Sequence, residues 1–203
     1  MVIHFTNSIV ILISIQAQAQ LPTQFGEFTI TVFAEHQDEP MPHIALSKIK
    51  DATLTPYVRI HSECITGEAF GSRKCDCGPQ LHRAMEIIAE RGGHLVYLRQ
   101  EGRGIGLINK IKAYHLQDQG MNTLDANLHL GFKGDERDYS AGVQILQLLN
   151  VDRLNLITNN PLKLDYLTNS GIIVEDRTPL IIPAEPYNIE YLKVKKDLMG
   201  HLF

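Results

Sequence analysis

The chain has 203 residues, of which 44% are hydrophobic, and this suits one domain with a full core or at most two small ones. Its net charge of −4 at pH 7 excludes a global attraction to nucleic acid, so an anionic ligand must be bound by a local cluster of cations. Three cysteines form no secreted disulfide pattern and indicate a reducing compartment.

The first twenty residues contain a short apolar run, residues 8–15, followed by Ala17-Gln18-Ala19, which imitates a signal-peptidase site. Residues 1–7 contain no Lys or Arg, so the basic start of a secretory signal is missing. The run is also too short to span a bilayer. We therefore predict that residues 1–20 form an N-terminal extension or strand that packs on the domain or on a second subunit, with a signal peptide as the alternative.

The rest of the chain alternates between strand and helix patterns. Residues 25–33 alternate apolar and polar side chains as a half-buried strand does, and residues 36–43 indicate an exposed loop. Further strands are predicted at 57–60, 95–98, 153–157, 172–174 and 180–182, and helices at 78–91, 107–119, 140–149, 161–169 and 189–199. Ile108, Ile111 and Leu116 are the predicted buried stripe of the second helix. This order predicts an α/β fold, a single compact domain with a mixed β-sheet flanked by helices.

All the cysteines of the chain, Cys64, Cys75 and Cys77, lie between residues 59 and 77. Two sulfurs of a C-x-C pair can bind one ion where the backbone turns, as Gly78-Pro79 favours. Thiolates favour zinc over magnesium or calcium. Three protein ligands leave a position for water, as in catalytic zinc sites, whereas His61 or His82 as a fourth ligand would close the site. Both kinds of zinc site remain open, and buried core cysteines are the alternative.

The strand at 95–98 is followed by a glycine-rich turn, residues 99–107, and then by a helix. Glycines in such a turn let backbone N–H groups approach phosphate oxygens at a helix N-terminus. The predicted phosphate site consists of Arg99, Arg103, Lys110 and Lys112, opposed only by Glu101. A solvated helix face explains Lys110 and Lys112 equally well, but not Arg103 between glycines. After the strand at 153–157, the side chains of residues 158–160 suit recognition of a base or sugar.

Seven short motifs occur in order along the chain: R-I-H-S-E-C from Arg59, C-D-C-G from Cys75, R-Q-E-G-R-G-I-G-L from Arg99, A-Y-x-L-Q-D-Q-G from Ala113, G-F-K-G-D-E-R-D-Y from Gly131, T-N-N-P from Thr158 and M-G-H-L from Met199. Together they resemble GTP cyclohydrolase II, the family that begins riboflavin biosynthesis, over about residues 21–203. The resemblance implies that residues 21–203 are the catalytic domain of a zinc-dependent, cytoplasmic homodimeric hydrolase. Its substrate would be GTP, and neither nucleic acid nor a membrane is an expected partner. Many relatives carry a fused N-terminal synthase domain, which this chain lacks, so we expect the protein to be monofunctional.

The implied reaction opens the imidazole ring of GTP, releases formate and diphosphate, and leaves 2,5-diamino-6-(5-phosphoribosylamino)pyrimidin-4-one. Carried over by the motifs, Cys64, Cys75 and Cys77 would hold one Zn2+ per subunit. The implied GTP contacts are Arg59, Ile60, His61, Ser62, Glu63, Gln80, Glu101, Gly102, Arg103, Thr123, Thr158 and Lys163, with Mg2+ on the phosphates.

Three residues have catalytic roles implied by the resemblance. Asp135 is similar to the proposed proton acceptor, Arg137 to the group proposed to attack the α-phosphate, and Tyr114 to a residue needed for ring opening. A guanidinium stays protonated at neutral pH, so electrostatic stabilisation by Arg137 is an equally good account. The carboxylate of Glu101 can accept from the guanine amino group and ring N–H, which distinguishes guanine from adenine.

Three other functions compete with this interpretation. A zinc nucleobase deaminase shares H-x-E at His61 to Glu63, but it requires P-C-x-x-C, which is absent here. A related enzyme opens the ring and stops at the formamide, an outcome that a replaced tyrosine gives in this family, whereas Tyr114 is present. A noncatalytic zinc-stabilised binding protein would have no evident use for Tyr114, Asp135 and Arg137.

Overall fold

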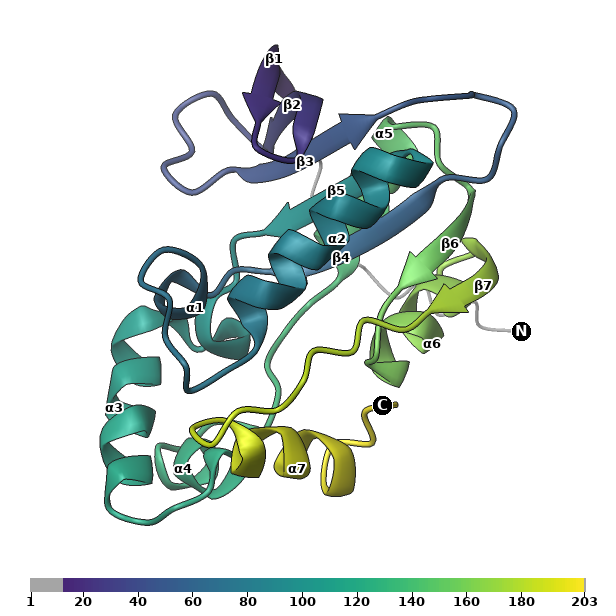
Figure 1. Cartoon of the computed structure of the whole chain (residues 1–203). Helices are drawn as coiled ribbons and strands as arrows, with labels where there is room; N and C mark the ends of the chain where they lie inside the picture. The colour runs from purple at the N-terminus through teal and green to yellow at the C-terminus, as the bar shows by residue number, and fades with distance from the viewer. Residues whose placement is uncertain (1–12, 203) are drawn as a thin grey trace, which may run out of the picture.

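The computed structural model describes residues 13–202, which contain one seven-stranded sheet with helices on both faces (Figure 1). The strands are β1 (Ser14–Thr23), β2 (Gly26–Ala34), β3 (His43–Lys48), β4 (Tyr57–Ser62), β5 (Gly93–Leu98), β6 (Arg153–Ile157) and β7 (Ile173–Thr178). The helices are α1 (Ile65–Glu68), α2 (Cys77–Arg91), the 3-10 helix η1 (Glu101–Gly104), α3 (Gly106–Asp118), α4 (Thr123–His129), α5 (Ser140–Leu148), α6 (Pro161–Asn169) and α7 (Ile189–Asp197).

The sheet is mixed, which confirms the predicted α/β class. The strand order is β1-β2-β3-β5-β4-β6-β7, and the pairs from β1 through β2 and β3 to β5 are antiparallel. From β5 through β4 and β6 to β7 the pairing is parallel. Two apolar clusters hold the helices against the sheet. Ile88 of α2 packs with Phe28 and Leu95, whereas Leu146 of α5 and Leu167 of α6 pack with the other cluster.

The parallel half of the sheet determines where a site can form. The chain passes from β4 through α2 to β5 on one side of β4, and then returns to β6 on the other side of β4. In open α/β sheets, ligands bind outside the carboxyl ends of the strands where the strand order reverses in this way. Residues just after β4, β5 and β6 therefore meet at one edge, near α1 and α7 in Figure 1.

The N-terminal prediction falls mostly on residues that the structure does not describe. Of the apolar run 8–15, the strand β1 includes only its end, from Ser14. This strand crosses residue 20 and pairs with β2 as far as Thr23 opposite Gly26. Within the described part of the chain, no helix is both long and apolar enough to cross a bilayer.

Most predicted elements are confirmed within a few residues, but three expectations about them are wrong. The strand β3 was not predicted, because it follows directly on the proline-containing loop 36–43. Residues 180–182 form no strand. Instead, the side chain of Asn159 binds both the N–H and the C=O of Leu180, at 2.8 and 2.7 Å, in place of a strand partner.

The third wrong expectation concerns the face of α3 that is buried. Ile108 and Ile111, predicted to be buried, are 74% and 48% exposed. Lys110 and Ala113 are buried instead, because they face the functional site. The apolar stripe that the sequence shows is therefore on the outer surface of the molecule.

Candidate active site

The three cysteines form a cluster at the carboxyl end of β4. Their Sγ atoms all lie within 4.8 Å of one another, and Cys64 Sγ is 3.6 Å from Cys75 Sγ. Cys64 follows β4, whereas Cys75 and Cys77 lie at the start of α2. Two glycines permit this approach. A Cβ on Gly78 would lie 2.4 Å from the C=O of Gly67, and a Cβ on Gly67 would lie 2.9 Å from Cys75 Sγ.

The charges around the sulfurs fit a bound cation. Hydrogen bonds from Cys75 and Cys77, together with the Lys110 ammonium, hold the pKa of Cys64 well below its usual value. The hydrogen bond to Cys64 raises the pKa of Cys75 to about 11, and hydrogen bonds with Cys64 and Cys75, together with burial, raise the pKa of Cys77 well above its usual value. Cys75 and Cys77 can therefore join Cys64 as thiolates only with added positive charge, and soft sulfur ligands suit zinc. Cys64, Cys75 and Cys77 could hold such an ion.

No histidine among the described residues joins the sulfur cluster. His61 Nε2 lies 2.8 Å from Glu68 Oε1, and its ring stacks on Tyr97. His82 packs against Phe25, with 5.3 Å between the ring centroids. The arrangement therefore favours the three-ligand alternative and provides no histidine ligand of the kind that a zinc deaminase requires.

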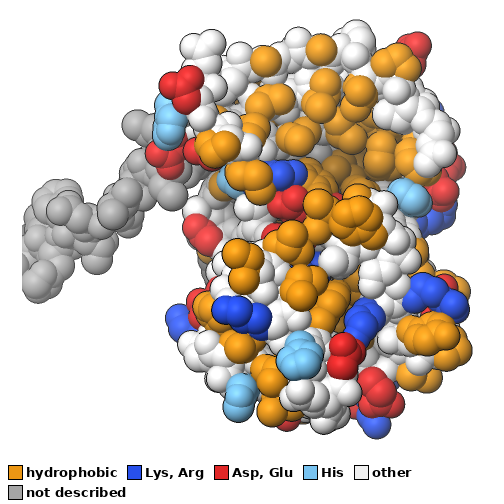
Figure 2. Space-filling view, turned by 90° about the vertical axis from the view of Figure 1, so that its left-hand side faces the viewer, with side chains coloured by type: hydrophobic (Ala, Val, Ile, Leu, Met, Phe, Trp, Pro, Cys, Tyr) orange, Lys and Arg blue, Asp and Glu red, His pale blue; other side chains and the backbone are white. Residues whose placement is uncertain are grey.

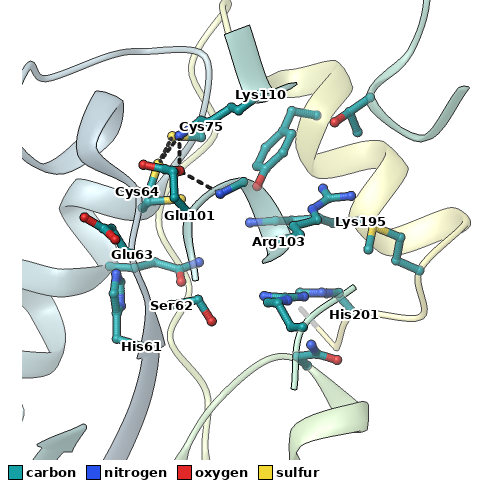
Figure 3. Close-up of a pocket in the computed structure, with 18 of the residues that line it drawn as sticks. His61, Ser62, Glu63, Cys64, Cys75, Glu101, Arg103, Lys110, Lys195 and His201 are labelled. Atoms are coloured by element: carbon teal, nitrogen blue, oxygen red, sulfur yellow. Dashed lines mark hydrogen bonds and ion pairs between the residues drawn. The ribbon is translucent and has the colours of Figure 1, made fainter. Parts of the chain in front are cut away.

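Lys110 and Glu101 are held next to the sulfurs (Figure 3). Lys110 Nζ lies 3.1 Å from Cys64 Sγ and 2.8 Å from Glu101 Oε1. The other oxygen of Glu101 accepts the N–H of Ile65 at 2.7 Å. Both carboxylate oxygens of Glu101 are thus engaged within the protein. Glu63 keeps one buried oxygen, Oε2, that has no hydrogen-bond partner among the described residues.

The same pocket has a further set of cations, two of which, Arg103 and Lys195, are labelled in Figure 3. We call this set the cation cluster; it consists of Arg59, Arg103, Arg137, Lys163 and Lys195. Burial lowers the pKa of Lys163 well below its usual value, and the charges of Arg59 and Arg137 lower it further. Burial, with help from Lys195 and Arg137, lowers the pKa of His201 to about 3. Such crowding of positive charge favours an anionic ligand.

Arg103 is held in a left-handed backbone conformation, with φ of 64°. This conformation is uncommon outside glycine, and such residues cluster at functional sites. The loop before α5 holds it, because the N–H of Glu136 binds the C=O of Arg103 at 3.0 Å and Arg103 Nη1 binds the C=O of Gly134 at 3.2 Å. Arg103 Nη2 is buried without a partner among the described residues and is available to a ligand.

Arg137 and Asp135 form a pair at the edge of the cation cluster. Arg137 donates from Nε to Asp135 Oδ1 at 2.8 Å and from Nη2 to Oδ2. Burial would lower the pKa of Arg137, but the hydrogen bond and the charge of Asp135 outweigh it and raise this pKa. Arg137 lines the pocket, whereas Asp135 lies behind it and is not among the lining residues.

The structure brings nearly all of the sequence-predicted residues into one pocket. The predicted residues that line it are Arg59, His61, Ser62, Glu63, Cys64, Cys75, Cys77, Gln80, Glu101, Gly102, Arg103, Tyr114, Thr123, Arg137, Thr158 and Lys163. Besides Asp135, only Ile60 is not among the lining residues. Its side chain is buried in the apolar core, and its C=O accepts Lys163 Nζ at 2.6 Å.

The four cations of the predicted phosphate site in residues 99–112 do not lie together. Arg103 belongs to the cation cluster, but Lys110 faces the sulfurs. Arg99 instead pairs with Glu63 at 3.1 Å, and Lys112 is not a lining residue. Asn159 and Asn160 do line the pocket, yet their side-chain oxygens bind backbone N–H groups of Leu180 and Leu162.

Sequence reasoning missed the contribution of the C-terminal segment. Tyr191 and Lys195 of α7, and Met199 and His201 after it, line the pocket. Asp76, between two of the cysteines, was also missed as a partner of Lys195. The sequence offered one signal for this contribution. Lys195 follows Val194 on the buried side of an amphipathic helix, where a lysine needs a partner.

Comparison with known proteins gives a consistent result. The model of the GTP cyclohydrolase II family matches residues 14–179. The chain is 53% identical over 193 residues to the GTP cyclohydrolase-2 of Acinetobacter baylyi, covering 92% of this chain and 94% of that protein. It is 49% identical over 187 residues to the GTP cyclohydrolase-2 of Buchnera aphidicola, covering 91% and 96%. It also matches the riboflavin biosynthesis protein RibBA of Cytophaga hutchinsonii at 51% identity over 185 residues, but spans only 45% of that longer protein.

Proposed function

The chain belongs to the GTP cyclohydrolase II family, and we propose that its pocket opens the imidazole ring of GTP and releases formate and diphosphate. The product would be 2,5-diamino-6-(5-phosphoribosylamino)pyrimidin-4-one. One observation carries this proposal. A single pocket is lined by three sulfurs and, as a separate set of residues, by the cation cluster, of which Arg59, Lys163 and Lys195 are buried. These two sets match the two ends of GTP, the guanine ring and the triphosphate.

Buried polar atoms in the pocket support a polar ligand of this kind. Arg59 Nε, Arg103 Nη2 and Glu63 Oε2 are buried and lack a hydrogen-bond partner among the described residues. Buried polar atoms are normally paired, so unpaired ones need an explanation. Two donors on the cation side and one acceptor near the sulfurs suit phosphate oxygens and guanine N–H groups respectively.

Zinc held by Cys64, Cys75 and Cys77 would supply a Lewis acid that activates water at neutral pH. The residues around it position the substrate. Lys110 and Glu101 hold the Cys64 side of the cluster in place through the contacts described above. The cation cluster, apart from Lys195, binds the triphosphate and its Mg2+ and fixes the ring against the sulfurs. Arg137, kept charged by Asp135, stabilises the charge that develops as diphosphate leaves.

Tyr114 lies where it can complete ring opening. It lines the pocket, and its hydroxyl lies 3.3 Å from Thr66 Oγ1, two residues after Cys64. Burial raises the pKa of Tyr114 to about 12, so the hydroxyl keeps its proton at neutral pH. We propose that this hydroxyl donates a hydrogen bond to the opened ring as formate leaves.

Replacing Tyr114 with phenylalanine should therefore slow formate release by about 100-fold or more, with much less effect on diphosphate release. The formamide intermediate should accumulate, which chromatography of the products can detect. Tyr187→Phe is the matched control, because Tyr187 is 68% exposed and does not line the pocket. Equal losses of formate and diphosphate in Tyr114→Phe would contradict this role.

We propose that the exposed apolar face of α3 binds a second copy of the chain, giving a homodimer. Figure 2 shows hydrophobic side chains on the face of the molecule that carries α3. Leu107, Ile108, Ile111 and Leu128 there are 42%, 74%, 48% and 53% exposed. A contiguous exposed apolar patch is typical of an interaction surface.

Ile108→Glu should convert the dimer into a monomer in analytical ultracentrifugation, because it places a charge in the centre of this patch. Ile181→Glu is the control, since Ile181 is also exposed, at 57%, but lies away from α3. A dimer that persists in Ile108→Glu would show that another surface is used.

A further inference from the structure

The C-terminal segment closes one side of the pocket and is fixed there at both ends. Asn159, which follows β6, binds the backbone of Leu180 with its side chain. The C=O of the same residue accepts the N–H of Leu202 at 2.8 Å. Asn159 thus joins the start and the end of the segment that contains α7. This segment lies outside the residues matched by the family model, 14–179.

Lys195 of α7 is the first member of a buried chain of polar contacts. Lys195 Nζ lies 2.8 Å from Asp76 Oδ1, and Asp76 Oδ2 accepts Gln80 Nε2 at 2.5 Å. Gln80 Oε1 in turn accepts Arg59 Nη2 at 2.6 Å. All four residues are at most 8% exposed. Arg59 is also fixed by the C=O of Ile157, at 3.1 Å.

This chain of contacts connects both sides of the pocket. Asp76 is the residue between Cys75 and Cys77, so its position fixes the loop that carries two of the three sulfurs. Arg59 belongs to the cation cluster and has a buried Nε without a partner among the described residues. A change at Lys195 therefore reaches the loop that carries Cys75 and Cys77 through one hydrogen bond and Arg59 through three.

We propose that Lys195 is a positioning residue, which holds the Cys75–Cys77 loop through Asp76 and orients Arg59 through Gln80. The part that concerns Arg59 rests on the proposed function, since it assumes that Arg59 binds the substrate phosphates. The part that concerns the Cys75–Cys77 loop does not rest on the proposed function. It predicts that Lys195 affects the affinity of the protein for zinc even when no nucleotide is present.

Lys195→Met tests the proposal because it removes the charge and keeps most of the buried side-chain volume. Residues that position metal ligands typically change metal affinity by about 10- to 100-fold when replaced, and a loss of this size is expected for zinc. Zinc affinity is measured by competition with a chromogenic chelator on the full chain. The KM for GTP should also rise more than kcat falls, and Lys195→Arg should recover part of both losses.

Lys196→Met is the matched control, because Lys196 is the adjacent lysine of α7 and is exposed. It should keep the zinc affinity and the KM of the unchanged protein. If Lys195 were only structural, Lys195→Met would lower the melting temperature while zinc affinity stayed within about twofold. That result would overturn the proposal.

A double-mutant cycle with Asp76→Asn identifies the route of the effect. Asparagine keeps an acceptor for Gln80 but removes the charge that Lys195 binds. If Lys195 acts through Asp76, adding Lys195→Met to Asp76→Asn should change zinc affinity by no more than about twofold. Additive losses would overturn the proposal.

The cycle also covers the case in which Lys195→Met does not fold because it leaves a buried, unpaired carboxylate. The double variant lacks that charge and is then compared with Asp76→Asn alone. A change in zinc affinity of no more than about twofold supports the proposal, and a larger loss overturns it. Failure of the proposed function would give a different result. The unchanged protein would release no formate, but its zinc affinity would still depend on Lys195.

Discussion

Replacing Cys75 with serine is expected to abolish formate release while diphosphate release continues. Residues that only position metal ligands are worth about 10- to 100-fold in affinity or activity, so the loss of a direct ligand should cost at least about 100-fold in formate release. The cation cluster is a separate set of lining residues that includes no cysteine. The phosphate chemistry should therefore depend less on the metal than the ring chemistry does.

Diphosphate release is the internal control for folding and for GTP binding in Cys75→Ser. The zinc content of the purified variant should fall in parallel with formate release, as measured by atomic emission. If the variant lost zinc but still released formate at the original rate, zinc bound by the three sulfurs would not be needed for ring opening, and the proposed mechanism would be wrong.

Arg137→Met should have the opposite pattern, with diphosphate release falling by about 1000-fold, the lower end of the range for arginines that stabilise phosphoryl-transfer transition states. The guanidinium donates two hydrogen bonds to Asp135, is only 13% exposed and is kept charged. It is therefore preorganised to meet negative charge without reorganising. Arg153→Met is a suitable control, because Arg153 forms a similar pair with Glu175 on the surface, where it is 51% exposed.

Arg137→Lys separates the two roles that are open for this residue. A lysine keeps the charge but loses the bidentate geometry, so electrostatic stabilisation predicts partial activity. Near-normal diphosphate release in this variant would exclude a nucleophilic arginine. A loss as complete as that in Arg137→Met would contradict the purely electrostatic account.

The sequence predicted those parts of the site that are local in the chain. The C-x-C pair and Cys64 follow a strand and precede a helix, and this order alone indicates that their sulfurs can meet. Residues that meet only through tertiary contacts were harder to predict. Lys195 and Asp76 are 119 residues apart, and no pattern in either segment links them. The phosphate site was sought within residues 99–112, whereas Arg59 comes from β4, Lys163 from α6 and Arg137 from the loop before α5.

The fold was predicted where periodicity and burial agree, as in α2. It was mispredicted where the apolar face of a helix is exposed and does not pack on the core. In α3 the apolar stripe containing Ile108 and Ile111 is exposed, while the buried face carries Lys110, paired with Glu101 and Cys64. Hydrophobic periodicity identifies a helix but cannot tell whether its apolar face meets the core or another surface.

The most direct test of the proposed function is to incubate the zinc-loaded protein with GTP and Mg2+ and to quantify formate and diphosphate together. The pocket, with its sulfur cluster and cation cluster, predicts equal molar yields of the two products. Diphosphate without formate, at full zinc occupancy, would contradict the proposal that this pocket opens the guanine ring.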